Sequence, residues 1–232
     1  MPLRRPRLIT FDAFGTLFQS EGVADPGVMT GIVTRNNLTL APEDLAQVWW
    51  DRSYQIAFED FVPVREATRM ALASLFLEWG VDDDAAAHTQ QLLEAWAETD
   101  PYPETSETLG ALEEFDLGIV SNIDVDMLQS LLRRSGLGSR FAVLVTSEET
   151  RTYKPHRGIF QEALQRAGSR PEEALHLGDS ADDVLGAKRT GMMAGWINRY
   201  AGTLDVGVPN PDLTAPSLRE AADLILGRRP EQ

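Results

Sequence analysis

The stretch Leu8-Ile9-Thr10-Phe11-Asp12-Ala13-Phe14-Gly15-Thr16-Leu17 is an apolar run that ends at a carboxylate and turns at once through Gly15 and Thr16. We expect it to form a strand that delivers Asp12 into a glycine-containing loop. A carboxylate presented in this way is suited to nucleophilic attack, because the ester that it forms is later opened by water and one difficult displacement becomes two easier ones. The alternative interpretation of this stretch alone is a buried strand followed by an ordinary turn.

Three later segments place polar side chains where structured runs end. One apolar run leads into Ser121-Asn122, and another leads into residues 178–183, which read Gly-Asp-Ser-Ala-Asp-Asp. Between them, a polar segment ends at Lys154-Pro155, ahead of a stretch typical of a helix. Ligands bind at the carboxyl ends of the strands in open α/β sheets, so these segments are expected to share one site with Asp12.

Each of these segments also has an interpretation without catalysis. Ser121-Asn122 fits turn residues after a strand, and residues 178–180 fit the N-cap of a helix, a role that is compatible with metal binding. Lys154 taken alone fits a solvated loop residue. We interpret Asp182 as an exposed neighbour or a helix-capping carboxylate rather than a ligand, because consecutive loop side chains rarely point the same way.

Taken together and in this order, the aspartate, the hydroxyl group, the lysine and the acidic loop resemble the motifs of the haloacid dehalogenase-like hydrolase superfamily. The resemblance covers nearly the whole chain. It implies an α/β fold, a Rossmann-like parallel sheet covered by helices on both faces, with the inserted helical cap of subfamily I. It also implies that Asp12, Lys154, Thr16 and Ser121 are catalytic, with the last three and Asn122 binding the substrate.

The acidic loop predicts a cation beside Asp12. Carboxylates brought together in one pocket repel one another, so either one is protonated or a cation lies between them. Oxygen ligands of this kind favour Mg²⁺. The resemblance implies that the metal is held by Asp12, the backbone carbonyl of Phe14 and Asp179, with Asp183 binding directly or through water.

Phe14 is the main departure from the superfamily's phosphatases, which usually carry a second Asp at this position. That Asp protonates the leaving alkoxide and then activates water, and a phenyl ring can do neither. General acid–base help is worth about a hundred- to ten-thousand-fold in rate, so a phosphatase built on Asp12 alone would favour leaving groups that need no proton. His156, Asp124 or a cap residue are the candidates to replace the missing acid.

An aromatic residue at this position is similar instead to the first motif of the 2-haloacid dehalogenases, whose halide leaving group needs no proton. The other motifs depart from that group. Those enzymes work without a metal and have a Ser- and Asn-containing loop where this chain has Asp179, and a Tyr where it has Phe160. They carry a cap Arg directly after a Trp, whereas here Trp49-Trp50 precedes Arg52, which could still meet a substrate carboxylate.

These observations predict a magnesium-dependent hydrolase with an aspartyl nucleophile, a phosphatase acting on a small phosphorylated metabolite. The alternative enzyme is a metal-free 2-haloacid dehalogenase. A third alternative, from another class, is a non-catalytic phosphate- or partner-binding protein, which loss of the acid would permit. Retention of Asp12, Lys154 and Asp179 favours an enzyme.

Composition limits the other possibilities. The chain has 232 residues, a net charge of −15 and no cysteine, which excludes disulfides and thiolate metal sites. The negative charge argues against nucleic acid as a partner, and no apolar run approaches the roughly 20 residues that span a bilayer. We expect a cytoplasmic protein, a monomer or homodimer, whose small anionic substrate meets a pocket made locally positive by the metal and Lys154.

The chain divides into two predicted domains, a catalytic core at 1–20 and 101–232 and a helical cap at 21–100. In the cap, apolar residues recur at spacings of three and four, which predicts helices at 42–58, 65–79 and 84–98. Trp49, Trp50 and Tyr54 are interpreted as packing between these helices rather than as a substrate cage. From residue 104 onward strands alternate with helices, which is typical of a parallel sheet covered on both faces.

Overall fold

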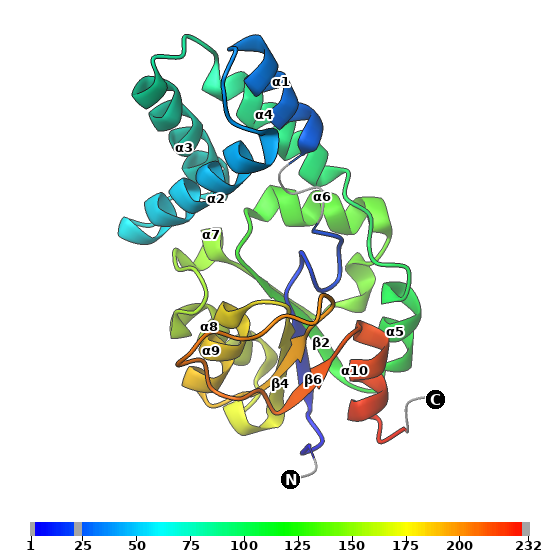
Figure 1. Ribbon diagram of the computed structural model, residues 1–232. Helices are drawn as coiled ribbons and strands as arrows, with labels where there is room; N and C mark the ends of the chain where they lie inside the picture. The colour runs from blue at the N-terminus through cyan, green and yellow to red at the C-terminus, as the bar shows by residue number, and fades with distance from the viewer. Residues whose placement is uncertain (1–2, 21–24, 229–232) are drawn as a thin grey trace.

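The computed structural model describes residues 3–20 and 25–228 (Figure 1). Its centre is a sheet of six parallel strands in the order β3-β2-β1-β4-β5-β6. The strands are β1 (Leu8–Phe11), β2 (Asp116–Ser121), β3 (Val143–Thr146), β4 (Ala174–Gly178), β5 (Met193–Ile197) and β6 (Leu213–Ala215). This confirms the predicted α/β class. Because β1 pairs with β2 and β4, the residue that follows it, Asp12, lies at the middle of the sheet edge.

The helices are α1 (Pro26–Arg35), α2 (Pro42–Glu59), α3 (Val64–Trp79), α4 (Ala85–Ala97), α5 (Thr105–Ala111), α6 (Val125–Ser135), α7 (Ser147–Thr150), α8 (Arg157–Ala167), α9 (Ala181–Thr190) and α10 (Leu218–Ile225). Short 3₁₀ turns occur at Gly138–Arg140 and Pro171–Glu173. Within the described ranges, none of the helices combines the length and the apolar character that crossing a membrane would require. The cytoplasmic location and the oligomeric state stay predictions.

Both faces of the sheet are covered, which explains why β1 is apolar along its whole length. All four of its residues are buried. Side chains of successive residues point to opposite faces: Ile9 and Phe11 join the apolar cluster that contains α5, α6 and α10, whereas Leu8 joins the cluster of α8 and α9. Figure 1 shows α8 and α9 on one side of the sheet and α5 and α10 on the other.

Helices α1 to α4 pack together beyond the carboxyl ends of the strands (Figure 1). The sequence predicted α2, α3 and α4 to within one residue at each end. It missed α1, although Asp25 and Pro26 are a start signal: Oδ1 of Asp25 accepts a hydrogen bond of 2.9 Å from the amide of Val28, and Pro26 occupies the first turn. The division into core and cap stays a prediction, and its boundary at residue 21 lies outside the described residues.

The start of α3 is attached to the sheet side of the molecule by buried hydrogen bonds. The fully buried carboxylate of Asp124 accepts from the amides of Val64 and Arg65 at 2.7 and 3.0 Å. The hydroxyl of Tyr153 donates to the carbonyl of Val62 at 2.6 Å. Asp124 therefore caps a helix. His156, the other named candidate for the missing acid, similarly accepts from the amide of Gly158 at the start of α8.

Candidate active site

The loop after β1 holds Asp12 in a fixed place. The amide of Asp12 donates to the carbonyl of Leu177 on β4 at 2.9 Å, which continues the sheet by one residue. The chain then turns tightly, since the amides of Leu17 and Phe18 both donate to the carbonyl of Ala13 at 2.9 Å. Asp12 is buried. A nucleophile on a short loop tied at both ends has little freedom to leave its position.

Gly15 is required in this loop for two reasons. Its φ of +77° lies in the left-handed region, and a Cβ atom there would lie 2.0 Å from Oδ2 of Asp179. The backbone of the nucleophile loop therefore approaches the acidic loop more closely than any side chain would allow.

Replacing Gly15 by Ala is expected to displace Asp179 or the loop and to lower turnover by about a hundredfold, because a misplacement near 1 Å costs that much. Gly80→Ala is the matched control: Gly80 also has a positive φ, +66°, but its Cβ would meet nothing within 4 Å. The control should lose only the roughly 1–2 kcal/mol of left-handed strain in unfolding free energy, measured by urea denaturation, and keep its activity. Equal activities in the two variants would contradict the close approach of the loops.

Arg199 fixes the same loop from the other side, and the sequence analysis missed it. Its guanidinium donates to the carbonyls of Gly15 and Thr16 at 3.1 and 3.0 Å. It also pairs with Glu104 at 2.7 Å and lies 3.5 Å from the centre of the Tyr102 ring. Arg199 follows β5 at the carboxyl edge of the sheet, which is the signal that could have found it.

Lys154 joins two carboxylates. Its Nζ lies 2.6 Å from Oδ1 of Asp12 and 2.6 Å from Oδ1 of Asp183, and all three side chains are buried. Burial alone would lower the pKa of Lys154, but Asp12 and Asp183 raise it above its ordinary value, so the ammonium stays charged. Asn122 positions the lysine, because its Oδ1 accepts from the backbone amide of Lys154 at 2.7 Å.

Asp183 has its acceptor positions occupied by protein donors. Oδ1 accepts from Nζ of Lys154 at 2.6 Å and from Nε2 of His176 at 2.9 Å, with Thr10 fixing the other ring nitrogen at 2.9 Å. Oδ2 accepts from the amide and hydroxyl of Ser180 at 3.1 and 2.5 Å. Burial would raise the pKa of Asp183, but Lys154 and His176 hold it below its ordinary value. This carboxylate orients Lys154 and caps α9, and its role as a metal ligand stays a prediction.

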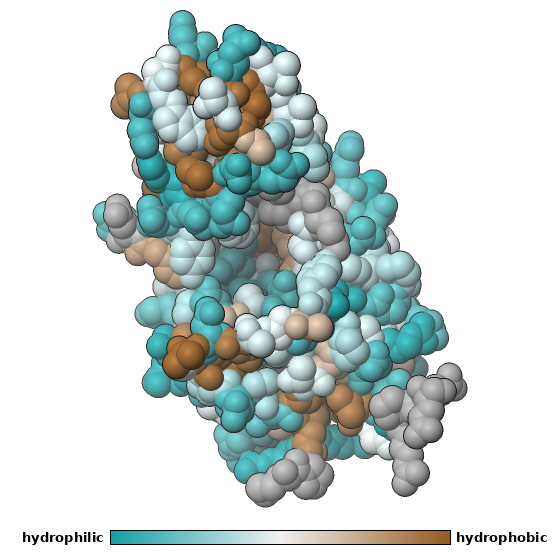
Figure 2. All heavy atoms as spheres, viewed as in Figure 1, coloured by the Kyte–Doolittle hydropathy of each residue, from teal (hydrophilic) through white to brown (hydrophobic). Residues whose placement is uncertain are grey.

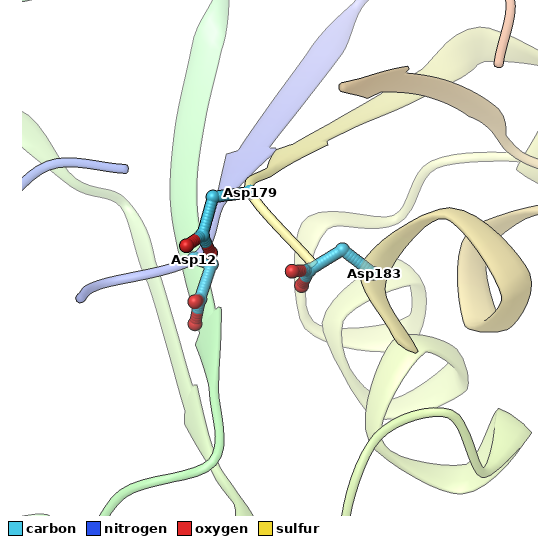
Figure 3. A group of neighbouring side chains, drawn as sticks. All are labelled: Asp12, Asp179 and Asp183. Carbon is cyan, nitrogen blue, oxygen red and sulfur yellow. The ribbon is translucent and has the colours of Figure 1, made fainter. Parts of the chain in front are cut away.

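Asp179 lies in one group with two other carboxylates of the predicted site. Asp12, Asp179 and Asp183 each offer an oxygen, and these oxygens lie within 4.8 Å of one another. Figure 3 shows Asp12 and Asp179 close together and Asp183 opposite them at the start of α9. Burial, together with the charges of Asp12 and Asp183, raises the pKa of Asp179 to about 8. Burial also raises the pKa of Asp12, which Lys154 opposes.

The hydroxyl groups of the predicted site differ in their surroundings. Ser121, Asn122 and Lys154 line a cavity together with Asp12, whereas Thr16 is not among the described lining residues. Thr16 is fully buried, and its Oγ1 has no hydrogen-bond partner within the described part of the chain. The catalytic and substrate-binding roles of these residues stay predictions.

The cavity lies between the nucleophile and the helices above it and has a volume of about 680 Å³. Figure 2 shows the surface hollowed between these helices and the rest of the molecule. Trp49, Trp50 and Tyr54 of α2 all line the cavity. The packing interpretation fits Trp49, which is fully buried with its ring 6.2 Å from that of Trp96. Trp50 and Tyr54 are half exposed.

Two side chains near the cavity are committed to other contacts. The guanidinium of Arg52 donates to Ser74 at 3.0 Å and pairs with Glu78 at 2.9 Å, and Arg52 does not line the cavity. The carboxylate of Asp182 accepts from the hydroxyl of Tyr54 at 2.7 Å. This hydrogen bond connects α2 with the start of α9 across the mouth of the site.

The profile of one protein family, "haloacid dehalogenase-like hydrolase", matches residues 6–191. Haloacetate dehalogenase H-2 of Moraxella sp. is 26% identical over 230 residues, covering 96% of this chain and 99% of that protein. The solved L-2-haloacid dehalogenase of Xanthobacter autotrophicus superposes with a TM-score of 0.80 at 25% identity, covering 96% of this chain and 99% of that one. A glyceraldehyde 3-phosphate phosphatase of Methanopyrus kandleri is 42% identical, but over 54% of this chain and 56% of its own.

These comparisons contradict the prediction of a magnesium-dependent phosphatase. The haloacid dehalogenases align over nearly the whole chain, including the helices above the site, whereas the phosphatase aligns over about half of it. The phosphatase prediction rested on the acidic loop around Asp179. Phe14 favoured the dehalogenase alternative, because a phenyl ring cannot supply a proton and a halide leaves without one. The hydrolase matches also disfavour a non-catalytic binding protein.

Proposed function

Since the chain belongs to the haloacid dehalogenase-like hydrolase family, we propose that it hydrolyses the carbon–halogen bond of a 2-halo carboxylic acid, with Asp12 as nucleophile. The observation that carries this proposal is the pairing of a buried Asp12, held 2.6 Å from Lys154, with Phe14 at the position where a phosphatase needs an acid. The haloacid dehalogenases that align over nearly the whole chain support the same reaction.

The reaction balances without a proton donor for the leaving group. A carboxylate oxygen of Asp12 attacks C2 of the substrate, the C2–O bond forms, and the halide departs with the electron pair of the carbon–halogen bond. Water then adds to the carboxyl carbon of Asp12, the acyl C–O bond breaks, and a 2-hydroxy acid leaves. Asp179 lies beside Asp12 and is placed to take a proton from that water and pass it to the departing C2 oxygen. In the ester Asp12 no longer carries the charge that helps to raise the pKa of Asp179, so Asp179 is a better-ionised base at this step. Attack on C2 occurs once, so the configuration at C2 is inverted.

The three carboxylates suit a hard cation in type, and Asp12, Asp179 and Asp183 with the carbonyl of Phe14 are the residues that would hold Mg²⁺. A bound ion would supply positive charge beside Asp12. Lys154 already supplies one charge to two of the three carboxylates, so the proposed displacement has an electrostatic partner within the protein.

Bromide release from L-2-bromopropionate and from larger L-2-bromo acids tests this proposal, with the D enantiomers as matched controls and with EDTA or Mg²⁺ added. We expect bromide and the D-2-hydroxy acid in equal amounts from the L enantiomers, with and without EDTA. Turnover of p-nitrophenyl phosphate without bromide release from any acid would overturn it.

A further inference from the structure

The cavity beside Asp12 is much larger than the smallest substrates that its relatives are named for. Haloacetate, for which one relative is named, and chloropropionic acid, which is bound in one solved dehalogenase, contain only a handful of heavy atoms. A volume of about 680 Å³ lies instead within the range of roughly 300–1,000 Å³ that holds ligands of drug size. Most of this space would stay unfilled around a two- or three-carbon acid.

One wall of the cavity, formed by α2, presents an aromatic stripe. Trp50, Tyr54 and Phe58 are spaced four residues apart on α2, so they lie on one face of the helix. All three line the cavity, and their exposed fractions are 47%, 43% and 41%. The rings of Tyr54 and Phe58 stack with their centres 4.3 Å apart. Met29 and Ala46 extend the apolar wall.

The charges around the cavity limit which side chain of a substrate it can bind. Besides Asp12 and Asp179, Glu43 and Asp182 contribute carboxylates to the lining, and Lys154 is the one cation among the described lining residues. Its charge is already shared between Asp12 and Asp183. A second anionic group on the substrate would therefore meet repulsion with no compensating cation, whereas a neutral apolar group would meet the aromatic stripe.

From these contacts we infer that the substrate is a 2-halo acid with a large, neutral, aromatic side chain that lies along Trp50, Tyr54 and Phe58 while C2 lies against Asp12. This inference rests on the proposed dehalogenation and specifies its substrate class. The carboxylate of the substrate lies on the floor of the cavity, where Ser121 and Asn122 offer neutral donors. The side chain gains binding energy by covering rings that water otherwise contacts.

The test compares kcat/KM for bromide release from L-2-bromopropionate, L-2-bromohexanoate and L-2-bromo-3-phenylpropionate. We expect kcat/KM to rise along this series, and the phenyl acid to exceed bromopropionate by about tenfold or more, because each buried methylene is worth about 0.8 kcal/mol. Bromopropionate turned over as well as or better than the phenyl acid would overturn the inference and leave the proposed function standing. No bromide from any acid would remove the proposed function itself.

Two variants test whether the aromatic wall of the cavity causes the preference for the phenyl acid. Ala46→Phe places a ring inside the cavity, and Trp50→Ala shortens the aromatic stripe at a half-exposed position where folding is not at stake. In both, the ratio of kcat/KM for the phenyl acid to that for bromopropionate should fall about tenfold. Ala87→Phe, at an exposed position of α4 away from the cavity, should leave both values unchanged. An unchanged ratio in both cavity variants would contradict the inference.

Discussion

Asp12→Asn is expected to lower the rate of bromide release by at least about a thousandfold, because the amide is a poor nucleophile and the covalent route is lost. The folded protein should lose little or no stability. Burial penalises the charge of Asp12, and Lys154 keeps its second partner, Asp183. Steady-state bromide release measures the first effect and urea denaturation the second.

A single turnover in water labelled with heavy oxygen separates nucleophilic catalysis from direct attack by water. The proposed route places the heavy oxygen in Asp12 first, and the hydroxy acid of the first turnover carries an oxygen that came from the protein. Mass spectrometry of the peptide that contains Asp12 detects the label. Heavy oxygen in the first-turnover product, with an unlabelled peptide, would show that Asp12 acts as a base instead.

Lys154→Met is expected to have the largest effect on stability. Removing the ammonium leaves Asp12 and Asp183 facing each other in a buried site, and breaking a buried pair in this way costs about 3–5 kcal/mol of unfolding free energy. Turnover should fall by about a hundredfold or more, since the charge that holds the nucleophile is gone. Urea denaturation and bromide release measure the two losses.

The double variant Lys154→Met/Asp183→Asn separates the two roles of the lysine. It removes one of the two uncompensated carboxylates, so most of the lost stability should return, because the penalty comes from unpaired buried charge. Activity should stay low, since Asp12 still lacks its ammonium partner. Recovery of activity together with stability would mean that Lys154 serves only the fold.

Local sequence predicted the sheet well, because the central strands β1, β2 and β4 are buried on both faces and therefore read as apolar runs bounded by polar turns. The same logic brought Asp12, Ser121, Lys154 and Asp179 to one edge. The roles of Arg199 and His176 were not predicted. Arg199 donates to backbone carbonyls and His176 contacts a buried carboxylate, and such contacts leave no spacing pattern in the sequence.

The reaction was harder to predict than the site. Ser180 and Asp183 satisfy both a helix-capping pattern and a metal-binding pattern, and only their hydrogen bonds show that protein donors already occupy Asp183. The size of the cavity depends on how α2 lies over the sheet, which follows from packing between distant segments and not from any short motif.

The attachments of the upper helices are unequal on the two sides of the cavity. At the start of α3, buried Asp124 accepts two backbone amides and also pairs with Arg65. On the other side, near the mouth, Tyr54 meets Asp182 through a single hydrogen bond between accessible side chains. The contact with fewer hydrogen bonds is expected to break first. Substrate entry would therefore separate Tyr54 from Asp182, while the hydrogen bonds between Asp124 and the start of α3 stay formed.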